Sequence, residues 1–265
     1  MSDFNNIISV LDSINKGNTI SLYVPSLKRE VLFKGITTGQ QKTLLKSAID
    51  NPVFQTRFIM ATHDIIVENC TEKEILSQLT FIDSLAILIQ YRVGIYGPEY
   101  IVEQENKKYK IDLSLCVTNL KNIILPSEQS FTEGAIVITV GVPSFADQYL
   151  LEKQVREKTM GEQSTVTIND TIGEAFIGEV SKFIKSIAVT VNGLSQDLEY
   201  KSLSFPKKYM VLEKLPTTVV KQILKYLETV ATIQHDLLHT NGVDTTDSTI
   251  KEIDFVIDSS LFALN

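Results

Sequence analysis

The sequence predicts an α+β protein: an N-terminal β-hairpin followed by helices, a second hairpin and a buried strand, and a long C-terminal helix. Two pairs of short β-prone runs are each joined by a few turn-forming residues, which is typical of hairpins. Several longer segments repeat apolar residues at helical spacing. Strands and helices do not alternate regularly, as they would in a doubly wound parallel sheet. The chain has 265 residues, of which 43% are hydrophobic, so it can bury a substantial core.

The N-terminal hairpin is predicted over residues 20–24 and 30–34, on either side of a loop that contains a proline. A helix should follow at once, because Thr37 and Thr38 offer N-cap hydroxyls. Each threonine has a glutamine three positions later, which is the spacing of a capping box. Pro52 should end this helix, because proline cannot continue the hydrogen-bond ladder.

Three further helices are predicted before residue 98. One covers 52–68, and the next begins near Thr71, which has a glutamate at the capping-box position. After a break at Thr80, the most apolar segment of the chain forms a helix over 81–96 and ends at a glycine. Polar residues interrupt this segment, and it is shorter than the roughly 20 residues that a bilayer crossing needs. It is therefore predicted to be a core helix.

The second half of the chain begins with another hairpin, predicted over 100–104 and 108–113. Residues 136–142 form an unbroken β-branched run and are predicted to be a strand buried on both faces. Ser144 and Asp147 then have the spacing that caps a helix, which should reach about residue 158. The remaining predicted elements are a loop over 159–170, a helix over 171–186, a strand over 188–191 leading to the turn Asn192-Gly193, a long helix opened by Pro216, a loop over 241–249 and a final strand over 250–257.

Two regions are predicted from this order of elements. Residues 1–98 form a hairpin plus a helical region, and residues 99–265 form a mixed α/β region that ends in a long helix and a short tail. A single continuous domain is the alternative.

Composition argues against several classes of protein. The 25 basic and 32 acidic residues give a net charge of -7, which provides no broad attraction for a nucleic-acid backbone. Cys70 and Cys116 are the only cysteines, too few for a disulfide framework, and we expect both to be reduced and buried. Residues 1–16 lack the basic start and apolar core of a signal peptide, so we expect the protein to stay in the cytoplasm where it is made.

Only three histidines are available for acid–base chemistry or metal binding: His63, His235 and His239. The last two are four residues apart on one predicted helical face, which is the geometry of helical zinc motifs. However, no glutamate stands between them as in metalloproteases, and the sequence marks no third ligand. A solvated or packed helix end is therefore the predicted role of this pair.

No other pattern in the chain predicts chemistry. The glycines form no phosphate-binding loop, and no nucleophile elbow occurs. Asp254 and Asp258 are predicted to lie on a solvated face rather than to form a glycosidase dyad. We thus predict no catalytic, cofactor-binding or metal-ligating residue, and no cofactor.

Three segments carry a resemblance to a known family. Residues 22–41 read LYVPSLKREVLFKGITTGQQ, residues 81–97 read FIDSLAILIQYRVGIYG with Arg92 near the helix end, and residues 205–237 form a long closing segment that contains His235. Together they resemble the T-even-type phage baseplate hub proteins, and the short segment 258–262 is similar too. Some members of that family carry a cysteine-bearing knuckle after the final helix. Here residues 240–249 contain no cysteine, so the resemblance implies no metal site.

The resemblance implies a non-enzymatic protein that acts in phage tail baseplate assembly through protein–protein contacts, as a hub subunit or as an assembly factor. Its partners would be other baseplate or hub proteins, in a homo- or hetero-oligomer, without a cofactor, nucleic acid or membrane. It would lie in the host cytoplasm during assembly and, if retained, in the virion tail baseplate. The hairpin within 20–34 could offer a free strand edge to a partner, and the loop 159–170 could order on docking.

Two other functions remain open from the residues alone. One is a cytoplasmic enzyme whose site is too scattered to recognise, built for example on His63 with Asp64 or on His235 with His239. The other is a cellular adaptor protein unrelated to phage.

Overall fold

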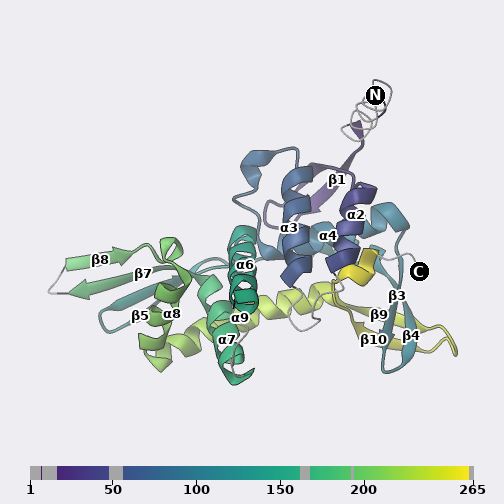
Figure 1. Ribbon diagram of the computed structural model, residues 1–265. Coiled ribbons are helices and arrows are strands. Elements are labelled where there is room, and N and C mark those ends of the chain that lie inside the picture. The colour runs from purple at the N-terminus through teal and green to yellow at the C-terminus, as the bar shows by residue number, and fades with distance from the viewer. Residues whose placement is uncertain (1–6, 8–16, 48–55, 162–167, 192–193, 263–265) are drawn as a thin grey trace. The chain divides into compact units, whose positions relative to one another are not determined.

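The computed structural model describes residue 7 and residues 17–47, 56–161, 168–191 and 194–262 (Figure 1). The chain forms two compact units. Unit 1 combines Met1–Ile123 with His235–Asn265, and unit 2 is Ile124–Gln234. The predicted division at residues 98 and 99 falls inside unit 1, because the C-terminal segment returns to pair with a strand near residue 110. The α+β class is confirmed, with antiparallel sheets and a long helix near the C-terminus.

The N-terminal hairpin of unit 1 is confirmed. Strands β1 (Thr19–Val24) and β2 (Arg29–Lys34) pair in an antiparallel register and bury one face against the helices. Both edges are partly occupied. Gln90 accepts from Tyr23 N at 2.7 Å and donates to Tyr23 O at 2.9 Å, while Thr71 donates through N and Oγ1 to Leu32 O. These contacts oppose the hypothesis that this hairpin offers a free edge to a partner strand.

Two helices follow the hairpin, α2 (Thr38–Lys46) and α3 (Thr56–Asn69). The predicted capping box is present, with Gln40 N donating to Thr37 Oγ1 at 3.2 Å. The start of the second predicted helix, residues 52–55, lies outside the described residues. The helix expected from Thr71 is wrong: only the short 3-10 turn η2 (Lys73–Ile75) forms there, because the Thr71 hydroxyl bonds Leu32 O instead of capping a helix.

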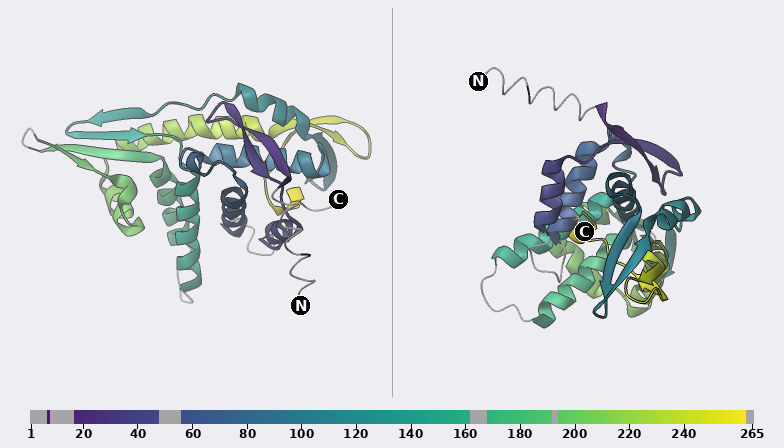
Figure 2. Two further views of the ribbon diagram at one scale, coloured as in Figure 1. Left: turned by 90° about the horizontal axis from the view of Figure 1, so that it is seen from above. Right: turned by 90° about the vertical axis from the view of Figure 1, so that its right-hand side faces the viewer.

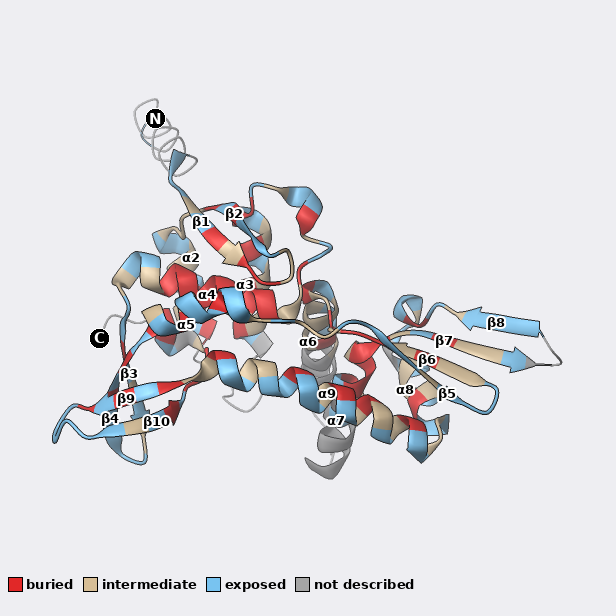
Figure 3. Cartoon of the chain, turned by 180° about the vertical axis from the view of Figure 1, so that it is seen from behind, coloured by how far each residue is buried: buried red, intermediate tan, exposed pale blue. Residues whose placement is uncertain are grey.

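Helix α4 (Phe81–Tyr96) is the most buried helix of unit 1, as its red bands in Figure 3 show. It begins at the Thr80–Asp83 capping box and ends at Gly97, whose φ of 84° closes the helix. Its polar residues bond to backbone of other segments. Asp83 accepts from Ser26 N, and Arg92 donates to two carbonyls beyond the helix end. The polar residues within this apolar segment therefore form hydrogen bonds that hold other segments to α4.

A four-stranded antiparallel sheet in the order β10-β9-β4-β3 completes unit 1. Its strands are β3 (Glu99–Gln104), β4 (Lys107–Asp112), β9 (His239–Asp244) and β10 (Ile250–Asp254). The predicted second hairpin and final strand are confirmed, and Glu105 and Asn106 turn the hairpin with φ of 55° and 63°. The loop predicted over 241–249 is wrong in its first part, because β9 pairs with β4 through partners far away in the sequence. Short elements that the sequence did not predict are α5 (Leu113–Asn119), η3 (Leu120–Asn122) and η5 (Ser259–Phe262).

Gly242 lies in β9 because its neighbours leave no room for a side chain. A Cβ atom there would lie 2.7 Å from Ile253 Cγ1 and 3.1 Å from Tyr109 Cβ. Gly242→Ala should therefore lower the free energy of unfolding by about 1–3 kcal/mol, measured by chemical denaturation. Gly94→Ala is the control, since a Cβ at this position in α4 meets nothing within 4 Å and should stabilise the helix by about 0.5–1 kcal/mol. Equal effects of the two substitutions would contradict the packing argument.

Unit 2 contains a second antiparallel sheet, in the order β5-β6-β7-β8. Its strands are β5 (Gln129–Glu133), β6 (Ile136–Val140), β7 (Ile184–Val191) and β8 (Leu194–Leu198). Strand β6 was predicted to be buried on both faces, but only Ile138 and Val140 are fully buried, which is the alternation of a strand with one covered face. The helix predicted to reach residue 186 ends at Phe183, because the following residues pair with β6. The turn predicted at Asn192-Gly193 lies outside the described residues.

The helices of unit 2 are α6 (Phe145–Gly161), α7 (Ile168–Phe183), α8 (Phe205–Lys214) and α9 (Thr217–Leu238), with a 3-10 turn η4 (Tyr200–Ser202). The last turn of α9, from His235 on, belongs to unit 1. The predicted cap of α6 is confirmed by reciprocal 3.1 Å bonds between Ser144 and Asp147. The loop predicted over 159–170 is helical at both described ends, and residues 162–167 lie outside the described residues. Figure 2 shows α9 running beside the sheet, where Tyr226 Oη donates to Pro126 O. Among the residues described, no helix has the length and apolar character that a membrane crossing requires.

Candidate functional site

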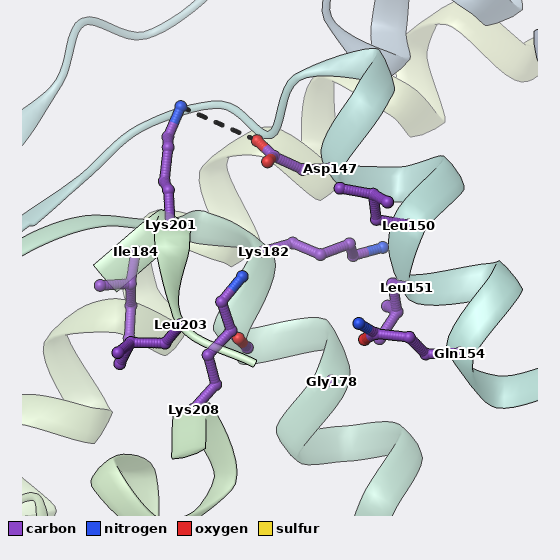
Figure 4. A pocket seen from close by; sticks show the side chains of 11 residues that line it. Asp147, Leu150, Leu151, Gln154, Gly178, Lys182, Ile184, Lys201, Leu203 and Lys208 are labelled. Atoms are coloured by element: carbon purple, nitrogen blue, oxygen red, sulfur yellow. Dashed lines mark ion pairs between the residues drawn. The ribbon is translucent and has the colours of Figure 1, made fainter. Parts of the chain in front are cut away.

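A cavity of about 80 Å³ lies in unit 2 where α6, α7 and α8 approach the start of β7 (Figure 4). Its polar lining comes from Asp147, Gln154, Ser181, Lys182, Lys201 and Lys208, and its apolar lining from Leu150, Leu151, Ile184 and Leu203, with Gly178 completing it. Small-molecule sites usually enclose about 300–1,000 Å³, so this cavity can hold a group the size of a carboxylate but not a whole substrate.

The cavity has an excess of positive charge. Three lysines and one aspartate line it, and a fourth lysine, Lys185, lies beside that aspartate. Asp147 Oδ2 is 3.9 Å from Lys201 Nζ and 4.0 Å from Lys185 Nζ, while its carboxylate also caps α6. Lys182 is paired with Glu179 at 2.7 Å. The single aspartate is thus shared between two ammonium groups.

The pKa values of two lysines at this cavity are lowered. Burial, and then the nearby Lys201 ammonium, lower the pKa of Lys185 below its usual value. Burial also lowers the pKa of Lys208. Both shifts mean that these ammonium groups have less water around them than a surface lysine has, and that the nearby Asp147 carboxylate does not fully offset this loss. An added carboxylate would increase the counter-charge.

A second cluster lies in unit 1, on the exposed face that β9 and β10 share. His239 and Asp254 are direct partners in the β9–β10 register. Asp254 Oδ1 lies 2.7 Å from His239 Nδ1 and 3.2 Å from His235 Nε2. The two imidazole rings stack, with centroids 5.0 Å apart and planes 22° from parallel. The Asp254 carboxylate raises the pKa of His239, and its own pKa is lowered in return.

This cluster corrects the prediction that His235 and His239 share one helical face, and it supplies a third polar group beside them. His235 and His239 do not share one helical face, because α9 ends at Leu238 and His239 is the first residue of β9. The rings still meet, and the fold adds Asp254 as the third group that the sequence could not mark. Asp258, the other acid of the predicted pair, instead accepts from Ser260 N at 2.7 Å.

The remaining candidate residues lie elsewhere in unit 1. His63 is on α3 with Asp64 Oδ1 at 3.4 Å, and burial lowers the pKa of its imidazole. Cys70 and Cys116 are free and buried, as predicted. Burial raises the pKa of both thiols, that of Cys116 to about 11, so neither is a ready nucleophile.

Comparison with known families distinguishes a phage baseplate protein from a cellular adaptor protein. The family model described as T4 bacteriophage base plate protein matches residues 18–255. The chain belongs to the T4 bacteriophage base plate protein family. No curated protein and no solved structure matches this baseplate protein. The resemblance of residues 22–41, 81–97 and 205–237 is thus confirmed at the level of the baseplate family, and membership implies that other phage baseplate proteins are its partners.

Sequence reasoning missed the lysine cavity of this baseplate protein. Its charged groups come from α6, α7, η4 and α8, separated by up to half of unit 2, and no spacing links them. The only available signal was local: Lys201, Lys207 and Lys208 fall close together in an acidic chain.

Proposed function

We propose that this baseplate protein acts in assembly of the central baseplate hub, without catalysis, by binding other baseplate proteins. It would serve as a subunit of the hub or as a factor that promotes hub assembly. The family match over residues 18–255 supports the baseplate role. The observation that carries the binding role is the lysine-lined cavity of unit 2, because three lysines and a single aspartate line it and its volume is small.

The occupant we assign to this cavity is an acidic segment of another baseplate protein. A carboxylate would enter between Lys201 and Lys208, while Leu150, half exposed at 53%, and Leu203 would contact an adjacent apolar side chain. The chain as a whole has a charge of -7, so the excess of lysine over aspartate in this lining is opposite in sign to the net charge of the chain. Charge pairs of this kind select a partner and speed its association.

The hub proposal is tested by following the protein through particle assembly in infected cells. Assembly intermediates and mature particles are purified, and the protein is quantified in each by mass spectrometry. Presence in both would identify a hub subunit retained in the virion tail baseplate. Presence in the intermediates alone would identify an assembly factor of the host cytoplasm, and absence from both would refute the hub proposal.

The cavity proposal is tested by charge reversal. The double variant Lys201→Glu with Lys208→Glu should weaken co-purification with baseplate partners by about tenfold or more, because the acidic segment would meet like charge. Lys221→Glu with Lys225→Glu is the matched control, since both lysines are exposed on α9 and the change in net charge is identical. Wild-type co-purification by the cavity variant, with its fold intact by circular dichroism, would refute the cavity as the docking place and leave the hub proposal standing.

A further inference from the structure

We propose that His235, His239 and Asp254 form a binding site for one divalent transition-metal ion, with Zn²⁺ as the expected ion. The site lies in unit 1, away from the lysine cavity, and does not depend on the proposed hub role. Its ligand atoms would be His235 Nε2, His239 Nδ1 and Asp254 Oδ1.

The distances fit a small tetrahedral ion. Zinc holds nitrogen and carboxylate ligands at about 2.0–2.2 Å, which places neighbouring ligand atoms about 3.3 Å apart. Asp254 Oδ1 is already 2.7 Å from His239 Nδ1 and 3.2 Å from His235 Nε2. All three ligand atoms lie within 4.8 Å of one another. Closing the third edge therefore requires a movement of about 1.5 Å or less between the exposed ring of His235 and the half-buried ring of His239.

Each imidazole has a second acid near its other ring nitrogen, just beyond hydrogen-bond distance. In metal sites, the ring nitrogen that does not bind the metal usually faces a carboxylate or a carbonyl, which orients the ring. His235 Nδ1 lies 3.6 Å from Asp236 Oδ1, and His239 Nε2 lies 4.0 Å from Glu252 Oε2. Each histidine thus has one nitrogen toward Asp254 and the other toward a second acid.

Charge and backbone geometry support the same assignment. Asp236, Glu252 and Asp254 bring three negative charges to two imidazoles, so a dication reduces the charge repulsion within the cluster. His239 and Asp254 are held opposite one another by the β9–β10 register, and His235 is held by the last turn of α9. Two nitrogens and one carboxylate favour zinc, nickel or copper over magnesium or calcium, which prefer oxygen ligands alone.

The site is open to solvent, which allows an ion to reach it. His235 and Asp254 side chains are 56% and 64% exposed, and the fourth position of a tetrahedral ion would face water. A bound ion would connect the end of α9 to both strands of the C-terminal hairpin. We therefore expect it to stabilise this junction against heat.

The test is titration of the full chain, first stripped with a chelator, with ZnCl₂ in an isothermal calorimeter. One ion per chain is expected. Asp254→Asn and His239→Gln should each weaken binding by about 100-fold or more, because each removes a direct ligand rather than a supporting group. His63→Gln should bind like wild type, since His63 faces an aspartate in the same unit but lies outside the cluster.

Two further readouts guard against a loss of fold. Added zinc should raise the melting temperature of wild type and of His63→Gln, but not of the two ligand variants. Cobalt in place of zinc should give the visible absorption of a tetrahedral site only in the proteins that bind. No zinc binding at 1 mM ion, or binding that both ligand variants leave unchanged, would overturn the assignment.

Discussion

Replacing Asp83 with alanine is expected to lower the free energy of unfolding by about 3–5 kcal/mol, because three donors would lose one buried acceptor group. The side chain is fully buried at the start of α4. Asp83 Oδ1 accepts from Ser26 N at 2.9 Å, and Oδ2 accepts from Thr80 N at 2.6 Å and Thr80 Oγ1 at 2.7 Å. The carboxylate thus caps α4 and also fixes the turn of the N-terminal hairpin to it.

Asparagine at this position should cost less than alanine. Burial raises the pKa of Asp83, and the hydrogen bonds from Ser26 and Thr80 oppose that rise without reversing it. A raised pKa means that the folded state holds the proton more tightly than the unfolded state does. The contribution of Asp83 to stability is therefore greatest below its ordinary pKa and falls as the pH rises through the raised pKa. Asp83→Asn keeps one acceptor and should lack this fall, as urea unfolding at several pH values would show.

A second N-cap aspartate provides the control. The Asp112 side chain accepts from Ser114 N at 2.9 Å at the start of α5, but it is exposed and bonds to no distant segment within the described part of the chain. Asp112→Ala should therefore cost only about 1 kcal/mol. Equal losses for the two alanine variants would show that the link from Asp83 to the hairpin adds nothing to an ordinary helix cap.

Features set by neighbouring residues were predictable from the sequence. The Thr37 and Ser144 caps and the hairpin turn at Glu105 depend on side chains within three positions, and the structure confirms each of them. Strand β9 was not predictable in the same way. Asn241 and Gly242 have the composition of a turn, yet Gly242 is required by the side chains of Ile253 and Tyr109, which lie diagonally across from it on the two neighbouring strands. Only the pairing itself shows why the glycine is there.

The candidate sites follow the same rule. The sequence showed His235 and His239 four residues apart, which is local information, and predicted no metal site because it marked no third ligand. Asp254 joins them through the β9–β10 register, where it is the partner of His239. The lysine cavity likewise depends on how three helices pack, and neither Lys201 nor Lys208 indicates Asp147 from sequence spacing. Both sites form because residues far apart in the sequence come together in the folded chain, which the residue types alone do not indicate.

Arg92 should be the second position with a large effect, because its guanidinium joins the end of α4 to strand β3. The residue is only 4% exposed. Nη1 donates to Gly97 O and Nη2 donates to Glu99 O, each at 2.9 Å, and the guanidinium lies 4.8 Å from the Tyr96 ring centroid. Arg92→Ala would leave two carbonyls without their donor and open a cavity, for an expected loss of about 3–5 kcal/mol in the free energy of unfolding.

The substitution Arg92→Lys separates the effect of the two guanidinium hydrogen bonds from the effect of the positive charge, because it keeps the charge. A single ammonium cannot reach both carbonyls with the geometry of the planar fork, so Arg92→Lys should still lose about 2–3 kcal/mol. Arg29→Lys is the control, because the Arg29–Glu72 pair is half exposed and should change stability by less than about 1 kcal/mol. Hydrogen exchange should accelerate at the amides of residues 97–104 in both Arg92 variants and not in the control. Unchanged exchange there, together with unchanged unfolding of Arg92→Lys, would mean that packing of Tyr96 and Tyr100 alone holds β3 to the helix, and that the buried charge contributes no more than a neutral side chain of the same size.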